Sequence, residues 1–140
     1  MKNLNQYLKF ESIFRIIVAV LAGESMLGLL ISIVQENIFG GISFNESPVF
    51  DLIFGGIGTF LCAFVSGVAA YLIVDKKTII PNLIMSILIT IESVNLILFS
   101  NSKDPFWFDT LAALSLLVGI WLGVLIYNKK YLNIVFRVNQ

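Results

Sequence analysis

The chain has 140 residues, of which 58% are hydrophobic and 13% are charged, and its nine basic and nine acidic residues cancel. Soluble domains carry about 25% charged residues, so this composition excludes an ordinary soluble globular fold. The sequence contains no histidine and one cysteine, Cys62, which excludes histidine ligation of haem or zinc, Cys-His catalysis and an intrachain disulfide. These counts predict a polytopic membrane protein with few routes to enzyme chemistry.

Four apolar segments are long enough to cross the hydrocarbon core of a bilayer, which requires roughly 20 helical residues. They cover residues 13–34, 52–74, 79–99 and 110–127. In lipid the backbone polar groups must bond within their own segment, and these continuous apolar runs lack the alternation of a β-barrel. The sequence therefore predicts an all-α membrane protein, a four-transmembrane-helix bundle that forms one domain over residues 1–140 in contact with the lipid bilayer.

The distribution of basic residues predicts the orientation of this bundle, because cytoplasmic loops retain Lys and Arg. Eight basic residues fall on one side of the predicted spans: Lys2, Lys9, Arg15, Lys76, Lys77, Lys129, Lys130 and Arg137. The other side has only Lys103. We expect both termini in the cytoplasm, with the protein in a bacterial inner membrane or a plasma membrane.

Segments outside the spans also carry structural signals. The first twelve residues combine apolar and basic positions, which suggests a short interfacial helix before the first span. Residues 35–51 contain Gly40, Gly41 and Pro48 and predict a loop long enough to cap the bundle. We expect three apolar side chains of this loop to lie back on the helices, namely Phe39, Ile42 and Phe44.

Local matches between the spans favour a tandem duplication of a helical hairpin. Glu24-Ser25 in the first span corresponds to Glu92-Ser93 in the third, at an offset of 68 residues. Phe50-Asp51 and Phe108-Asp109 open the second and fourth spans, at an offset of 58 residues. The offsets differ, so the repeat requires gaps, and chance agreement in an apolar chain is the alternative. A true repeat would be of the parallel transporter type, although a doubled hairpin is also a simple way to build a bundle.

Small residues in two spans predict where helices approach closely, since helix association in lipid depends on packing rather than on burial from water. The second and fourth spans carry such residues at four-residue spacing: Gly55, Thr59, Ala63 and Gly67 in one, and Ser115, Gly119 and Gly123 in the other. The second span has a further stripe of Gly58, Cys62, Ser66 and Ala70. We expect one of its stripes to pack within the bundle and the other to contact a second copy. The alternative is that glycine is simply common in membrane helices.

Two glutamates lie inside predicted spans, Glu24 near the middle of the first and Glu92 two thirds of the way through the third. A charged carboxylate near the bilayer centre costs at least about 2.5–3.5 kcal/mol, so such groups face the bundle interior and find partners or hold a proton. We predict a midplane site for a proton, a metal cation or a cationic substrate, with Ser25, Ser93 and Asn95 lending oxygen ligands. The structural alternative is that the glutamates are hydrogen-bond donors that fix helix register.

These features lead to three functional hypotheses. The leading one is a small transporter or channel for protons or cations, which uses Glu24 and Glu92 and forms a homo-oligomer. The second is a non-catalytic subunit that stabilises a partner membrane protein through its small-residue stripes. The third is a lipid-acting enzyme that uses Asp51 and Asp109 near the outer surface. No cofactor or resident metal is expected, and basic residues are not interleaved with aromatic ones, so nucleic-acid binding is not expected.

Overall fold

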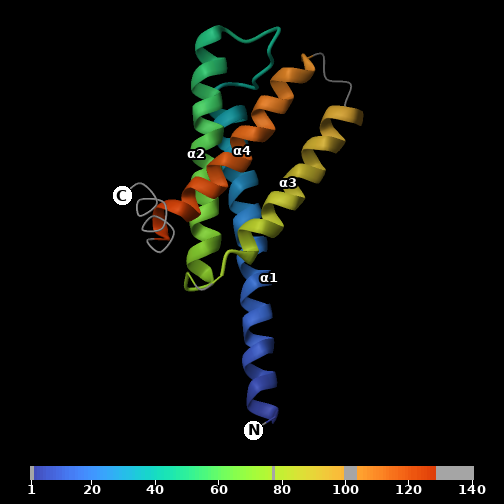
Figure 1. The fold of residues 1–140 in the computed structure, drawn as a ribbon. Coiled ribbons are helices and arrows are strands. Elements are labelled where there is room, and N and C mark those ends of the chain that lie inside the picture. The colour runs from blue at the N-terminus through green and yellow to red at the C-terminus, as the bar shows by residue number, and fades with distance from the viewer. Residues whose placement is uncertain (1, 77, 100–103, 129–140) are drawn as a thin grey trace, which may run out of the picture.

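A computed structural model describes residues 2–76, 78–99 and 104–128 of the chain, and these residues contain helices but no strand (Figure 1). The elements are α1 (Lys2–Ser32), a π-helix η1 (Ile33–Ile38), α2 (Val49–Ile73), α3 (Ile80–Phe99) and α4 (Phe106–Tyr127). Four helices are long and apolar enough to cross a membrane, which indicates an integral membrane protein. The prediction of an all-helical chain with four such helices is confirmed.

Proline marks the start of the three later helices. Pro48 and Pro105 directly precede α2 and α4, and Pro81 is the second residue of α3. Proline has no backbone N–H, so it is tolerated in a first helical turn, where that group would lack an intrahelical partner. Asp51 and Asp109 lie in the first turns of α2 and α4, where a negative charge complements the helix dipole.

The first helix is longer than the sequence pattern indicated. It runs without a break from Lys2 into η1, so the first twelve residues continue α1 and do not form a separate interfacial helix. In Figure 1 its N-terminal part projects beyond the other three helices. At its other end η1 occupies part of the predicted loop, and the loop before α2 is reduced to residues 39–48.

The two ends of the bundle differ in their connections. One end, called the turn end below, holds the short α2–α3 connection, where Asp75 and Lys76 adopt positive φ angles of 54° and 59°. The Tyr71 hydroxyl donates a hydrogen bond of 3.1 Å to the Lys76 carbonyl and closes this turn. The opposite end, called the loop end, holds residues 39–48. Lys77, Lys103, Lys129, Lys130 and Arg137, used in the orientation argument, lie outside the described residues.

α2 and α4 form the closest pair of helices, through the small residues that the sequence singled out. A Cβ atom added at Gly67 would lie 2.6 Å from the Ile120 carbonyl oxygen. Cβ atoms at Gly119 and Gly123 would lie 2.8 Å and 2.6 Å from the carbonyl oxygens of Phe60 and Phe64. Backbone meets backbone at each point, so no larger side chain fits there. Ala63 packs at the same contact, against Gly119.

The second stripe of α2 faces α1, so both stripes are used within the chain. Gly58 packs against Val34, and Ala70 packs against Gly23. Cys62 and Ser66 between them are buried. The expectation that one stripe of α2 contacts a second copy has no support, because α1, η1, α4 and the loop of the same chain cover both stripes in the described residues.

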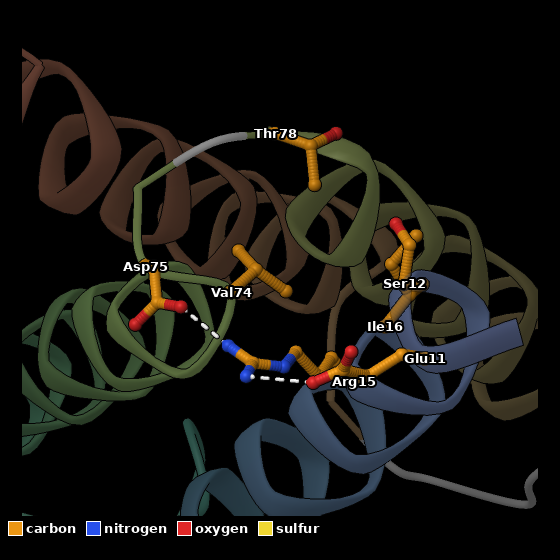
Figure 2. Close-up of a pocket in the computed structure, with 7 residues that line it drawn as sticks. All are labelled: Glu11, Ser12, Arg15, Ile16, Val74, Asp75 and Thr78. Carbon is orange, nitrogen blue, oxygen red and sulfur yellow. Dashed lines mark hydrogen bonds and ion pairs between the residues drawn. The ribbon is translucent and has the colours of Figure 1, made fainter. Parts of the chain in front are cut away.

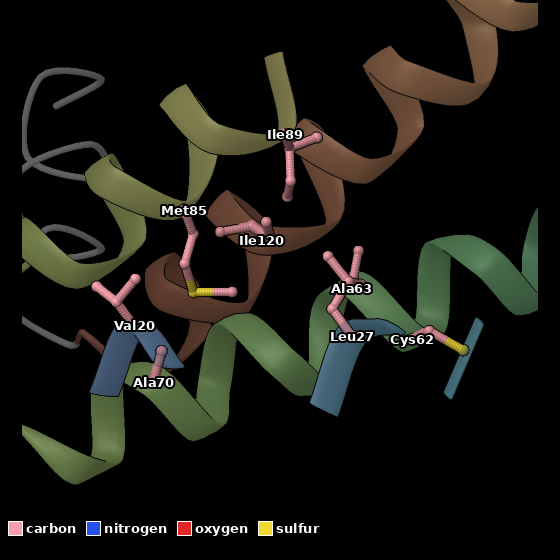
Figure 3. Close-up of a cluster of buried hydrophobic side chains, with 8 residues drawn as sticks. All are labelled: Val20, Leu27, Cys62, Ala63, Ala70, Met85, Ile89 and Ile120. Carbon is pink, nitrogen blue, oxygen red and sulfur yellow. The ribbon is translucent and has the colours of Figure 1, made fainter. Parts of the chain in front are cut away.

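α3 is attached mainly at the turn end. The side-chain amide of Asn82, which is fully buried, donates a hydrogen bond of 2.8 Å to the Gly67 carbonyl of α2. Met85 fills the space over Gly23 of α1. These contacts border a buried cluster of eight residues (Figure 3): Val20, Leu27, Cys62, Ala63, Ala70, Met85, Ile89 and Ile120. From this crossing α3 leans away from α1 toward the loop end (Figure 1).

The predicted packing of the loop onto the helices is confirmed at the loop end. Ile42 and Phe39 lie over Gly55, which provides the space for the Ile42 side chain. The Phe44 ring packs edge-on against Trp107, with ring centroids 5.0 Å apart. Asp104 accepts hydrogen bonds of 3.0 Å from the Ser43 hydroxyl and the Phe44 amide, which hold the loop against the start of α4.

The α2–α4 contact predicts a large difference between two glycines of one helix. Gly67→Ala places a Cβ against the Ile120 backbone, and we expect a loss of about 1–3 kcal/mol in the free energy of unfolding. Gly56→Ala is the matched control, because a Cβ there meets nothing within 4 Å and helix propensity gains about 0.5–1 kcal/mol. Unfolding in mixed micelles measures both; equal effects would contradict the close approach of α2 and α4.

Candidate functional site

A cavity of about 600 Å³ lies between α1, α3 and α4 in the half of the bundle nearer the loop end. Within the described residues α1 makes no close backbone contact with α4, and the cavity occupies the space between them. Sixteen residues line it: Glu24, Ser25, Leu27, Gly28, Ile31, Gln35, Thr59, Ile89, Glu92, Ser93, Leu96, Ile97, Asp109, Ala112, Ala113 and Leu116.

Helical spacing explains how α1, α3 and α4 share most of this lining. The α1 positions 24, 28 and 31 recur every three or four residues, so they lie on one face of the helix, and Gln35 of η1 follows four residues later. The α3 positions 89, 92 and 96 and the α4 positions 109, 112, 113 and 116 follow the same rule. The apolar faces that pack against α2 and those that border the cavity are therefore adjacent stripes of the same helices.

Four of the five predicted site residues meet at this cavity. Glu24 and Ser25 come from α1, and Glu92 and Ser93 come from α3. Asn95 does not line the cavity; its side-chain amide donates a hydrogen bond of 3.0 Å to the Ile91 carbonyl one turn earlier in α3. Asn95 follows Glu92 by three residues, but it lies one position off the stripe of 89, 92, 93 and 96 that faces the cavity.

Glu24 has an incomplete set of partners. Its Oε1 atom is buried and accepts no hydrogen bond from any residue that the structure describes. Glu92 is more exposed, and the two carboxyl groups are close enough to interact electrostatically. No Lys, Arg or His is among the lining residues. Because buried polar atoms are nearly always hydrogen-bonded, Oε1 of Glu24 marks a position for a donor from outside the chain.

Three polar lining residues were not among the predicted ligands of the glutamate site: Gln35, Thr59, which was expected only in helix packing, and Asp109, which was considered only for a lipid-acting enzyme. The Gln35 amide donates a hydrogen bond of 3.1 Å to the Thr59 hydroxyl, which joins η1 to α2 at the cavity wall. π-Helical turns often occur at functional sites, but their wider register cannot be read from a hydropathy pattern. Asp109 belongs to the first turn of α4, and its position near the end of a span suggested an interfacial residue. Asp51, its counterpart on α2, does not line the cavity.

The cavity ends toward the turn end in a packed floor. Leu27 and Ile89 line it and also belong to the buried cluster of Figure 3. Beyond them lie Val20, Ala70 and Met85 of the same cluster, which are buried between α1, α2 and α3. The cavity is therefore closed toward the turn end, and Gln35 and Asp109 line it nearer the loop end.

A second, smaller cavity of about 180 Å³ lies at the turn end, between α1 and the α2–α3 turn (Figure 2). Arg15 crosses it: the guanidinium forms an ion pair with Asp75 and a second one, of 3.1 Å, with Glu11 one turn earlier. Arg15 thus binds acidic groups at its own end of the bundle and leaves Glu24 without a basic partner. The Arg15–Asp75 ion pair ties α1 to the end of α2.

No group of three acidic, cysteine or histidine side chains in the described ranges is arranged to hold a metal ion. Glu24, Glu92 and Asp109 are spread around the cavity wall. No family model, no curated protein and no solved structure matches the chain.

If the cavity contains water, cysteines on its wall should react with a charged, membrane-impermeant thiol reagent. We expect Ser25→Cys and Ser93→Cys to be labelled in the reconstituted protein, because both line the cavity. Val118→Cys is the matched control, since Val118 is exposed on α4 outside the cavity and faces the lipid. Native Cys62 is buried and should stay unlabelled. Protection of both cavity cysteines, or labelling of Val118→Cys at the same rate, would mean that the cavity is filled by lipid.

Proposed function

We propose that this protein is an integral membrane carrier for protons or cations, and that Glu24 and Glu92 hold the transported charge. The observation that supports it is that carboxyl groups from two apolar helices line one cavity that has no basic residue in its wall. Placing two acids within the apolar spans is costly, and such residues commonly mark ion or proton pathways. A cavity lined by acidic and no basic side chains is suited to a cation.

The closed floor of the cavity favours a carrier over a channel. A channel requires a continuous path, whereas here the floor is closed by Leu27, Ile89 and the residues beyond them. A carrier exposes one site to the two sides in turn, by rocking helices about a fixed contact. The tight α2–α4 pair supplies such a contact. α1 and α3, which bear the glutamates, approach each other at Gly23 and Met85.

Two finer points belong to the same proposal. The excess of basic residues near the turn end would place that end in the cytoplasm, so the cavity would open to the outside. Glu24-Ser25 and Glu92-Ser93, which matched in the sequence, line the same cavity from the first and second hairpin. This symmetry supports a tandem duplication of the hairpin.

The rival hypothesis of a non-catalytic partner subunit is less well supported. It requires an exposed groove of small residues for a partner helix, and both small-residue stripes of α2 are occupied by α1, α4 and the loop. It also gives no role to a cavity with three carboxylates. A homo-oligomer or a partner membrane protein would have to bind another face of the bundle.

Flux measurements in proteoliposomes test the proposal. We expect the wild type to move protons or a monovalent cation down an imposed gradient, and Glu24→Gln and Glu92→Gln to fall to the level of empty liposomes, because each removes a charge from the cavity wall. Glu36→Gln is the control, since Glu36 is exposed on η1 and does not line the cavity. Wild-type activity in both cavity variants would refute the role of the glutamates.

The carrier mechanism also predicts that the Arg15–Asp75 ion pair favours the state in which the cavity is closed at the turn end. An exposed ion pair contributes about 0.2–1 kcal/mol, so Asp75→Asn should shift the ratio of the two states by up to about fivefold. The rate at which a Ser93→Cys background is labelled from the loop end should fall accordingly. Asp75→Glu should restore the labelling, and Glu11→Gln should leave it nearly unchanged. An unaltered labelling rate in Asp75→Asn would show that this contact plays no part in gating.

A further inference from the structure

The size and lining of the cavity say what kind of cation fits it. Its volume of about 600 Å³ lies within the range of about 300–1,000 Å³ that is typical of sites for small organic molecules. Eight of the sixteen lining residues are hydrophobic, among them Ile31, Leu96 and Leu116 from three different helices. A small inorganic ion would leave most of this space and all of this apolar surface unused.

The arrangement of the acids also argues against an inorganic ion. Metal cations such as Mg²⁺ and Ca²⁺ need about six or more oxygen ligands at about 2.0–2.6 Å. Among the residues that the structure describes, no three acidic side chains converge in this way. Glu24, Glu92 and Asp109 come instead from three different helices and face a shared space. Carboxylates arranged in this way suit an organic cation, in which the charge belongs to a larger molecule.

The lining further distinguishes between kinds of organic cation. Quaternary ammonium groups have no N–H donors, and proteins recognise them chiefly by the faces of aromatic rings. No Phe, Tyr or Trp is among the lining residues. The polar part of the wall consists of three carboxylates, three hydroxyls and one side-chain amide, and Oε1 of Glu24 is buried without a donor from the described residues. This wall therefore suits a cation that donates hydrogen bonds.

We propose that the cavity binds a protonated organic amine, whose N–H groups donate to the carboxylates of Glu24 and Glu92 and whose apolar body lies along Ile31, Leu96 and Leu116. This inference rests on the proposed carrier function and names the substrate class for the same site. Asp109, in the first turn of α4, lines the cavity near the loop end, where its negative charge would attract the cation. Charge-assisted hydrogen bonds to carboxylates supply the affinity and the preference for N–H donors.

Three probes of similar size test this assignment by calorimetry on the protein in lipid nanodiscs, with empty nanodiscs as the blank. The probes are phenethylammonium, its N,N,N-trimethyl derivative and neutral 2-phenylethanol. We expect phenethylammonium to bind at least about tenfold more tightly than the trimethyl derivative, since the latter cannot donate to the carboxylates. The neutral alcohol should give no signal above the blank. Equal affinity for the two ammonium ions would overturn the proposal.

The test uses variants on three different helices, so that a folding defect in one variant does not decide the result. Glu24→Gln and Glu92→Gln should each weaken phenethylammonium binding at least about tenfold, and Leu116→Asn should weaken it by removing apolar contact. Glu36→Gln should bind as the wild type does. Undiminished binding in both glutamine variants would overturn the proposal.

The same preparation separates failure of this inference from failure of the carrier proposal. If the proteoliposomes show glutamate-dependent flux of protons or Na⁺ but phenethylammonium neither binds nor competes, the amine assignment is wrong and the carrier remains. If phenethylammonium binds through Glu24 and Glu92 but neither it nor protons cross the membrane, the amine assignment holds and the carrier function is wrong.

Discussion

The direct backbone contact between α2 and α4 is the constraint on which the rest of the fold depends. Because lipid is as apolar as the side chains of the helices, close packing at small residues replaces the hydrophobic drive of soluble proteins. Because Gly67, Gly119 and Gly123 have no Cβ atom, carbonyl oxygens of the facing helix lie where a side chain would otherwise be. α1 then packs on the other small face of α2, and α3 packs chiefly on α4. With α1 and α4 held apart on a fixed frame, the cavity is the space that remains between them.

The bundle combines one tightly closed end with one loosely joined end. At the turn end the Asn82 hydrogen bond to Gly67, the packing of Met85 on Gly23 and the Arg15–Asp75 ion pair join α1, α2 and α3. At the loop end α3 leans away from α1, and the loop is held to α4 rather than to α3. This asymmetry gives a cavity whose floor at the turn end is packed, and the proposed carrier would use this arrangement as one of its two states. The reverse state would need the turn-end contacts to open while the α2–α4 frame persists.

Sequence reasoning succeeded where the determinants are local. Hydropathy predicted four apolar helices, and the spacing of small residues predicted that one stripe of the second span packs closely within the bundle. It also predicted that Glu24 and Glu92 face the bundle interior, and both line one cavity, although their role stays a prediction. It failed where the answer depends on which faces meet. Asn95 is close to Glu92 in sequence but lies off the cavity stripe. Asp109 was expected near the outer surface, because the sequence does not show the tilt of α4, which sets the depth of that residue. Both stripes of α2 are covered within the chain, which no pattern in a single helix can reveal.

A distance measurement across the loop end tests most directly whether the glutamate cavity is alternately exposed. Spin labels at Ile38→Cys on η1 and Leu98→Cys on α3, both exposed positions, report the separation of the two helices in a Cys62→Ala background. The account predicts two distance populations in lipid, whose ratio changes when protons or phenethylammonium are added and becomes insensitive to both in Glu24→Gln. A single distance distribution, unchanged by either addition and by the substitution, would contradict it.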